Sequence, residues 1–362
     1  MVDPAYRPLP IEIQTITSDW LTAALQGYAP GVEVRRADIV DMMRSTCTKI
    51  RLKLELANNP AERPIPDTVI LKGGFEPHSR LMDYMHEKEA NAYGKLLPEL
   101  GLHTPTPYFA DFDAEAKQGI VIMEDLATRG VTFCNPLVPH SFEAVARRLG
   151  DLARFHARSW DSPDLKPGGK WEWVDDIPRN CLRYFGGYLE PEVWGRFVRS
   201  SRGAAASVRF HDLAWMKDSL DRIAALSATL PRCVNHGDTH LGNLYVEADG
   251  TPGFFDSVAG HAPSMLEVAY HLGCALDTAD RPRWEGALIQ HYLDALREAG
   301  VEAPSFDEAL RQYAVFLAFG YCIFIINDAV FQAEAVNTAY TARFSAAMLD
   351  HDTIARLKEI PL

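Results

Sequence analysis

The sequence predicts an α+β protein of two lobes: a small β-rich lobe at the N-terminus, followed by a larger, mainly helical lobe. Length and composition give the first indication, because 362 residues with 47% hydrophobic side chains can bury a full core and commonly divide into two domains. The second is the order of the patterns, since strand-like runs gather in the first part of the chain and long helix-like runs dominate the rest. We expect an N-lobe over residues 1–125 and a C-lobe over residues 126–362.

Two strands around a polar turn are expected first. Residues 39–56 end in alternating apolar and charged side chains, the period-2 pattern of a half-exposed strand, and residues 44–48 form the turn. A short buried strand follows at 69–71 and ends at Lys72. An ordinary polar hairpin and a lysine that solvates a strand end would produce the same patterns.

Helices and one further strand complete the expected elements. A helix over 79–97 carries Glu89 and Tyr93 on one face, because the two residues are four positions apart, and Pro98 marks its end. An apolar strand at 119–123 runs into the acidic pair at 124–125. Ser141 is a candidate N-cap for a long helix, and the chain finishes with helical stretches over 283–299 and 306–357. The aromatic-rich segment 163–203, which follows the helix that begins at Ser141, could line an acceptor pocket or belong to the core.

The most informative motif is V-N-H-G-D-T-H-L-G-N-L-Y over residues 234–245, followed by G-F-F-D over 253–256. Asp238 and Asn243 are five positions apart, as are the catalytic Asp and the metal-binding Asn in the kinase loop H-R-D-x-x-x-x-N, and a second metal-binding acid is expected where Asp256 stands. A carboxylate at Asp238 can orient a hydroxyl and accept its proton, while the oxygens of Asn243 and Asp256 are hard ligands that suit Mg²⁺. A hairpin over 244–255 would bring these two ligands together. The spacing therefore predicts phosphoryl transfer from ATP.

A zinc site is the alternative for the same loop. His236, Asp238 and His240 alternate along the chain and could bind zinc from one strand edge. That interpretation leaves Asn243 and Asp256 without a role, whereas histidines in such loops commonly hold the turn through backbone hydrogen bonds. We therefore interpret His240 as structural.

The string H-G-D-T-H-L-G-N over 236–243 resembles the H-G-D-x-H-x-x-N loop of the aminoglycoside phosphotransferase and choline kinase superfamily. Members of that superfamily share a bilobal protein-kinase-like fold. Within it, the chain most resembles the bacterial phosphotransferases grouped with ecdysteroid kinase-like enzymes. The resemblance covers most of the chain, and its specific motifs lie between Lys72 and Asp256.

The resemblance implies a role for several further residues. Lys72 would contact the α- and β-phosphates of ATP, and Glu89 would pair with it. The turn over the phosphates would use Ser45, Thr46 and backbone amides. Segment 119–127 resembles the hinge between the family's lobes, and there the candidate adenine contacts are Met123, Glu124 and Leu126.

Two departures from the family pattern bear on these assignments. The turn at 44–48 has none of the glycines that let a protein-kinase backbone approach the phosphates. Ser257 replaces the usual Trp after the metal-binding acid, and Glu267 would take the place of an Asp that buttresses the loop. A catalytically silent nucleotide- or ligand-binding protein on the same fold is therefore the alternative function.

Charge and cysteine content limit the partners. Lys and Arg number 36 against 49 Asp and Glu, a net charge of −13, which argues against nucleic acid. The acids that gather around the motif would repel ATP without a divalent cation, which indicates a Mg²⁺ requirement. Six cysteines without C-x-x-C pairs fit a reducing cytoplasm. The start of the chain lacks a signal-peptide pattern, and the apolar run 314–326 is too short to span a bilayer, so we expect no membrane partner.

Together these patterns predict a cytoplasmic, ATP- and Mg²⁺-dependent kinase whose acceptor is a hydroxyl group of a small molecule. Asp238 is the expected catalytic residue, and Asn243 and Asp256 are the expected metal ligands. The sequence does not identify the acceptor, although the apolar and aromatic residues of 163–203 slightly favour a bulky hydrophobic alcohol. A preference for ATP over GTP and the oligomeric state are also left open.

Overall fold

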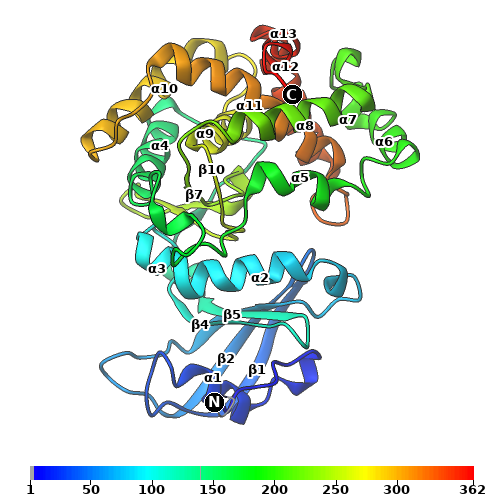
Figure 1. The fold of residues 1–362 in the computed structure, drawn as a ribbon. Coiled ribbons are helices and arrows are strands. Elements are labelled where there is room, and N and C mark those ends of the chain that lie inside the picture. Colours follow the sequence, from blue (N-terminus) through cyan, green and yellow to red (C-terminus); the bar gives the residue numbers. More distant parts are fainter. Residues whose placement is uncertain (1–3, 139) are drawn as a thin grey trace. The chain divides into compact units, whose positions relative to one another are not determined.

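The computed structural model describes residues 4–138 and 140–362, which divide into two compact units (Figure 1). One unit consists of Met1–Thr132 together with Gly253–Val258, and the other of Phe133–Pro252 together with Ala259–Leu362. The first is built around a β-sheet and the second is mainly helical, which confirms the expected fold class. The short segment Gly253–Val258, which carries Asp256, belongs to the sheet-containing unit although it lies late in the sequence.

The sheet of the first unit has five antiparallel strands in the order β1-β2-β3-β5-β4. Its strands are β1 (Glu33–Arg44), β2 (Thr48–Asn58), β3 (Thr68–Gly73), β4 (Pro107–Asp113) and β5 (Gln118–Glu124). The turn between β1 and β2 lies where the polar residues predict it. In the register of β2 with β3, Lys49 stands opposite Lys72, so both side chains project from the same face of the sheet.

Apolar side chains of the sheet form the core of this unit with the N-terminal helix α1 (Ser18–Leu25). Leu21 and Leu25 pack with Ile50 and Leu71, and all four are fully buried. The side chain of Thr17 caps α1 by accepting a hydrogen bond from Trp20 N. A short 3₁₀ turn, η1 (Ile13–Thr15), precedes this helix.

The helix expected over 79–97 is confirmed from residue 83 onward, but it is not a regular α-helix throughout. This stretch contains a 3₁₀ turn, an α-helix, a π-helical turn and a second short α-helix: η2 (Ser79–Leu81), α2 (Asp83–Asn91), η3 (Ala92–Leu96) and α3 (Leu97–Leu100). Pro98 lies in the first turn of α3, where proline is tolerated because that N–H has no partner within the helix, so it does not mark the end. Gly101 ends α3 with a left-handed φ of 61°.

The second unit contains most of the helices. They are α4 (Phe142–Ala157), α5 (Ile177–Phe185), α6 (Pro191–Val198), α7 (Ser201–Ala204), α8 (Leu213–Ser227), α9 (Ser264–Ala275), α10 (Arg281–Glu298), α11 (Phe306–Ile326), α12 (Glu334–Asp350) and α13 (Thr353–Lys358), with 3₁₀ turns η5 (Pro163–Leu165) and η6 (Val208–Phe210). The predicted N-cap is confirmed, since Ser141 accepts a hydrogen bond from Ala144 N. The stretch 306–357 is divided among α11, α12 and α13.

The apolar run at 314–326 is part of the longer helix α11. The expectation that this segment is too short to span a bilayer therefore does not hold for the whole helix. This helix has 21 residues and is the one helix in the described part of the chain that is long and apolar enough to cross a membrane. Of the most apolar 18-residue stretch of this helix, 83% is buried inside the protein. Packing as a core helix accounts for that composition.

Short strands frame the central motif. β7 (Cys233–Asn235) pairs antiparallel with β10 (Gly260–Ala262) and leads into the loop at 236–243, and β8 (Leu244–Val246) leads out of it. A turn follows in which Glu247 N donates to Thr251 O at 2.8 Å, and the chain continues into β9 (Pro252–Phe254). The strand-turn-strand expected over 244–255 is therefore present. β6 (Thr132–Phe133) and η4 (Leu126–Arg129) complete the elements.

Candidate active site

The motif loop at 236–243 is held in a defined turn. Gly237 has a φ of 88°, a conformation that favours glycine, and the 3₁₀ turn η7 (Leu241–Asn243) follows. His240 is the N-cap of η7, because its Nδ1 accepts a hydrogen bond from Gly242 N at 3.0 Å. His240 thus makes the structural contact expected of it, and its Nε2 also lies 3.5 Å from Oδ2 of Asp238. In residues 4–138 and 140–362 no group of three or more His, Cys, Asp or Glu side chains could hold a metal ion, so the zinc interpretation has no support.

Both carboxylate oxygens of Asp238 accept hydrogen bonds within the helical unit. Tyr270 Oη donates to Oδ1 at 2.7 Å, and Asn243 Nδ2 donates to Oδ2 at 2.8 Å. Asn243 Nδ2 also donates to the backbone oxygen of Asp238, at 3.0 Å. The carboxylate is thus fixed from two sides, and its side chain is still 29% exposed, so a substrate can reach it. Because the amide nitrogen of Asn243 faces Asp238, its carbonyl oxygen is the atom left for a cation.

Glu267, on α9, binds the backbone at the start of the loop. Its Oε2 accepts from His236 N at 2.9 Å and its Oε1 accepts from Gly237 N at 2.8 Å. His156 Nε2 lies 2.9 Å from Oε2. Burial by itself raises the pKa of Glu267, but these hydrogen bonds and nearby imidazoles bring it below its ordinary value. The expected buttressing role of Glu267 is confirmed.

Further buried side chains anchor the loop from α9 and α12. His271 Nδ1 lies 2.9 Å from Thr239 O, and burial lowers the pKa of His271 to about 3, so this imidazole is neutral. Leu241 N donates to Tyr340 Oη at 3.1 Å. The loop therefore has little freedom to change its shape, which is what orienting a reacting group requires.

In the sheet-containing unit, Asp256 meets two lysines. Its Oδ1 accepts from Lys72 Nζ at 2.8 Å and its Oδ2 from Lys49 Nζ at 2.5 Å. Lys72 Nζ also pairs with Glu89, the ion pair that the resemblance implies. Asp256 has a φ of 57°, and its backbone N donates to Tyr93 Oη at 3.1 Å, which fixes the carboxylate beside the lysines.

The charges in this cluster stabilise one another. Burial alone would raise the pKa of Asp256, but the ammonium groups of Lys49 and Lys72 hold it well below the ordinary value. Burial would lower the pKa of Lys72, whereas Asp256 and Glu89 raise it well above the ordinary value. Asp256 and Lys72 are therefore both ionised at neutral pH. Burial raises the pKa of Glu89, which the ammonium group of Lys72 partly offsets.

Ser45 and Thr46 lie at the tip of the β1–β2 hairpin and are half-buried. Ser45 Oγ donates to Cys47 O at 3.3 Å, and the carbonyl oxygen of Ser45 lies 3.0 Å from His78 Nε2. These contacts shape the turn without a glycine.

The expected adenine contacts lie at and just after the end of β5. Met123 is buried opposite Ile70 of β3. Glu124 N already donates to Thr106 O at 3.0 Å, so this N–H is not available to a ligand. Leu126 is buried in the first turn of η4.

Comparison with known proteins gives the family. The model of the phosphotransferase enzyme family matches residues 80–302, which is more than half of the chain. The chain belongs to the phosphotransferase enzyme family. A search among curated proteins gives no significant match.

Solved structures resemble this phosphotransferase in fold. A complex of APH(2")-IIia with GDP and kanamycin matches with a TM-score of 0.51 at 9% identity, over 92% of this chain and 98% of that one. An ethanolamine kinase from Plasmodium vivax matches with a TM-score of 0.50 at 10% identity, over 93% of this chain and 90% of that one. At such low identity the likeness shows the fold alone, and that is the protein-kinase-like fold expected from the sequence.

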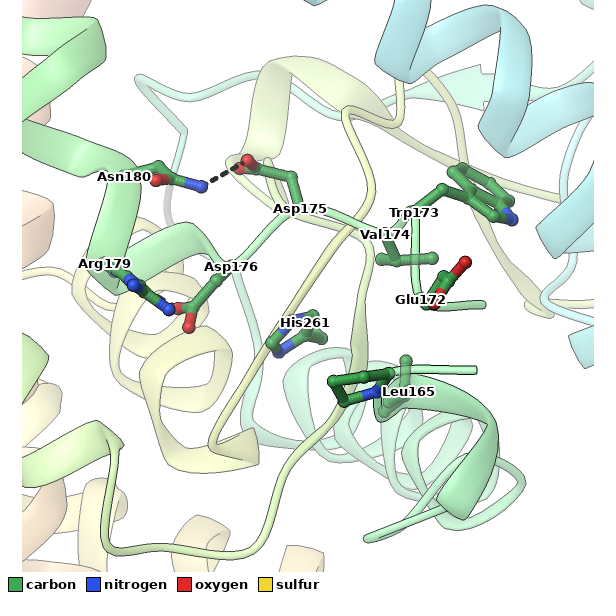
Figure 2. A pocket seen from close by; sticks show the side chains of 10 residues that line it. Leu165, Glu172, Trp173, Val174, Asp175, Asp176, Arg179, Asn180 and His261 are labelled. Carbon is green, nitrogen blue, oxygen red and sulfur yellow. Dashed lines mark hydrogen bonds between the residues drawn. The ribbon is translucent and has the colours of Figure 1, made fainter. Parts of the chain in front are cut away.

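The phosphotransferase also has an open pocket of about 590 Å³ in its helical unit, shown in Figure 2. The lining residues are Leu165, Pro167, Glu172, Trp173, Val174, Asp175, Asp176, Arg179, Asn180 and His261. Asp175 accepts a hydrogen bond from Asn180 Nδ2 at 2.7 Å, drawn as the dashed line. Of the aromatic residues in 163–203, Trp173 lines this pocket with 41% of its surface exposed, whereas Trp171 and Trp194 are buried. Tyr184, Phe185 and Tyr188 are half-buried, so the aromatic segment contributes both to the core and to partly exposed surface.

Sequence reasoning missed two residues at the site. Tyr270 follows Glu267 by three positions on α9, so helical spacing could have indicated that both face the loop. Lys49 could have been found from the strand pairing, because it stands opposite Lys72. Both are polar side chains with a partner far away in sequence.

Proposed function

We propose that this phosphotransferase is an ATP- and Mg²⁺-dependent kinase that transfers the γ-phosphoryl group to a hydroxyl of a small molecule. The observation that carries the proposal is the geometry of Asp238, whose two carboxylate oxygens are held by Tyr270 and Asn243 while the side chain is still accessible. A carboxylate held in this way suits the orientation of a hydroxyl nucleophile.

In the proposed reaction, Asp238 accepts a hydrogen bond from the acceptor hydroxyl and aligns its oxygen with the γ-phosphorus. The bond from that oxygen to phosphorus forms as the bond from phosphorus to the leaving oxygen of ADP breaks, and Asp238 takes the hydroxyl proton. Bound Mg²⁺ would neutralise charge on the phosphoryl oxygens.

The oxygens offered by this chain fit that ion. Asn243 presents a carbonyl oxygen and Asp256 an ionised carboxylate, both hard ligands, and we propose that they hold the same ion. The chain spacing of thirteen residues supports this pairing.

On the nucleotide side, we propose that Lys72, oriented by Glu89, contacts the phosphates. Ser45 and Thr46 are the proposed contacts of the phosphate turn. Adenine would bind beside Met123, with the backbone of Glu124 and Leu126 as its partners. The regions 1–125 and 126–362 are the proposed lobes, and the first three residues of the N-lobe lie outside the described residues.

The proposed acceptor is a small-molecule alcohol, and the proposed location is the cytoplasm. One neighbour in fold is solved in complex with GDP and kanamycin, and another is an ethanolamine kinase. The sequence resemblance favours the bacterial ecdysteroid kinase-like group. The pocket of Figure 2 is lined by Glu172, Asp175, Arg179 and an Asp176 that pairs with Arg232, a set of polar groups that favours a polar acceptor over a purely hydrophobic one.

A screen of hydroxyl compounds for Mg²⁺-dependent ADP release tests the proposal. Asp238→Ala should retain ATP affinity and lower turnover by about 100-fold or more, because it removes the proton acceptor. Asp221→Ala, an exposed acid on α8, is the control and should not change turnover. A silent binder would bind ATP and release no ADP, with or without Mg²⁺ and in all three proteins, and that result would contradict the proposal.

A further inference from the structure

Lys49 is a charged residue at the site whose role no sequence motif assigns. It lies on β2 directly opposite Lys72 of β3, and its side chain is 28% exposed. Its Nζ contacts Oδ2 of Asp256 at 2.5 Å and lies 5.8 Å from the centre of the Phe255 ring. The other oxygen of Asp256 is held by Lys72. Both oxygens of the proposed metal ligand are therefore already bound to ammonium groups of the same unit.

The charges of this cluster balance. Lys49 and Lys72 carry two positive charges, and Glu89 and Asp256 carry two negative ones, with contacts joining all four side chains. A divalent cation added here would introduce two unbalanced positive charges next to two ammonium groups. In a partly buried site that repulsion is weakly screened, so it opposes metal binding strongly.

Nucleotide phosphates change this balance. A triphosphate brings several negative charges and offers the lysine ammonium groups oxygen acceptors of their own. Lys49, at the partly exposed edge of the cluster, can move to a phosphate with less rearrangement than Lys72, which is 4% exposed and also held by Glu89. Its departure would free Oδ2 of Asp256 for the metal ion.

We propose that Lys49 acts as a tethered cation that occupies the metal-binding carboxylate of Asp256 until a nucleotide arrives. Lys49 is then a positioning residue that makes metal binding at Asp256 depend on nucleotide phosphate. The inference rests on the proposed function in that Asp256 is taken to be a metal ligand.

The test measures metal binding without nucleotide. Mn²⁺ binding to the full-length protein is followed by electron paramagnetic resonance and by calorimetry, for the wild type, Lys49→Met, and the double variant Lys49→Met with Asp256→Asn. We expect Lys49→Met to bind Mn²⁺ at least about tenfold more tightly than the wild type, because one positive charge in contact with the carboxylate is gone. The double variant should lose that gain.

Lys53→Met is the matched control, because Lys53 lies on the same strand and the same side of the sheet but is exposed to solvent. It should bind Mn²⁺ as the wild type does. An unchanged or weaker Mn²⁺ affinity in Lys49→Met, with the far-ultraviolet circular dichroism of the wild type, would overturn the proposal. A gain that survives Asp256→Asn would overturn it as well.

ATP binding, measured separately in the wild type, distinguishes the two proposals. If the wild type binds no ATP, the kinase function fails, while the nucleotide-free Mn²⁺ result still decides whether Lys49 blocks Asp256.

Discussion

Replacing the buried carboxylate of Glu267 with an amide tests how the motif loop is held. Glu267→Gln keeps the shape of the side chain and removes its charge. The carboxylate accepts three hydrogen bonds: two from the backbone N–H groups of His236 and Gly237, and one from His156. The amide oxygen can replace the carboxylate oxygen that accepts two of these bonds, but the NH₂ group then faces the remaining N–H donor.

The expected loss follows from these contacts. One buried N–H loses its acceptor, which costs about 1–3 kcal/mol, and two charge-assisted bonds become neutral ones, at about 0.5–1 kcal/mol each. We therefore expect the free energy of unfolding to fall by about 3 kcal/mol. The loss should be fully present above about pH 4.5, because hydrogen bonding to the ionised form lowers the folded-state pKa of Glu267 and the carboxylate is ionised there in both states. It should shrink as the pH falls through that lowered pKa, where wild-type Glu267 becomes protonated in the folded protein.

Urea unfolding followed by far-ultraviolet circular dichroism measures this difference at pH 7 and at several lower pH values. Glu298→Gln, at an exposed position near the end of α10, is the control and should change the free energy of unfolding by less than about 0.5 kcal/mol. A loss below about 1 kcal/mol for Glu267→Gln, or a loss that does not depend on pH, would show that the carboxylate does not hold the loop.

Two further substitutions separate positioning from stability. Tyr270→Phe removes the hydrogen bond to Asp238 Oδ1 and should lower turnover about tenfold, with ATP affinity unchanged. The free energy of unfolding should fall by at most about 1 kcal/mol, because the freed carboxylate oxygen can bind water. Steady-state kinetics with an acceptor from the screen measure the turnover, and an unaltered value would contradict the prediction. Ser141→Ala removes the N-cap of α4 and should lower the free energy of unfolding by about 1 kcal/mol, with a smaller loss for Ser141→Gly; urea unfolding measures both, and equal losses would argue against capping.

Local patterns in the sequence predict a good part of the molecule. The turn between β1 and β2, the strand that ends beside Lys72 and the N-cap Ser141 each depend on residues close together in the chain. The spacing of Asp238 and Asn243 also lies within one loop, and the structure joins these two side chains by a hydrogen bond. Such features are readable because the interacting groups are separated by a few residues.

Other features were hidden because their causes are distant in sequence. The pattern over 79–97 reads as one regular α-helix, yet a 3₁₀ turn precedes the helix and a π-helical turn interrupts it. Differences in helix propensity, at less than about 1 kcal/mol per residue, are too small to specify where such irregularities fall. The same reasoning applies to 306–357, which forms three helices.

By itself, the sequence determined the fold class and the chemical types of the side chains at the site, because hydrophobic period and motif spacing are local properties. Only the tertiary structure decided which charges meet. Asp256 joins the sheet-containing unit and lies between Lys49 and Lys72, partners 207 and 184 positions away. Strand register places the two lysines side by side, and the return of the chain after β9 brings the carboxylate to them. Contacts of that kind depend on how distant segments pack, which no short stretch of sequence specifies.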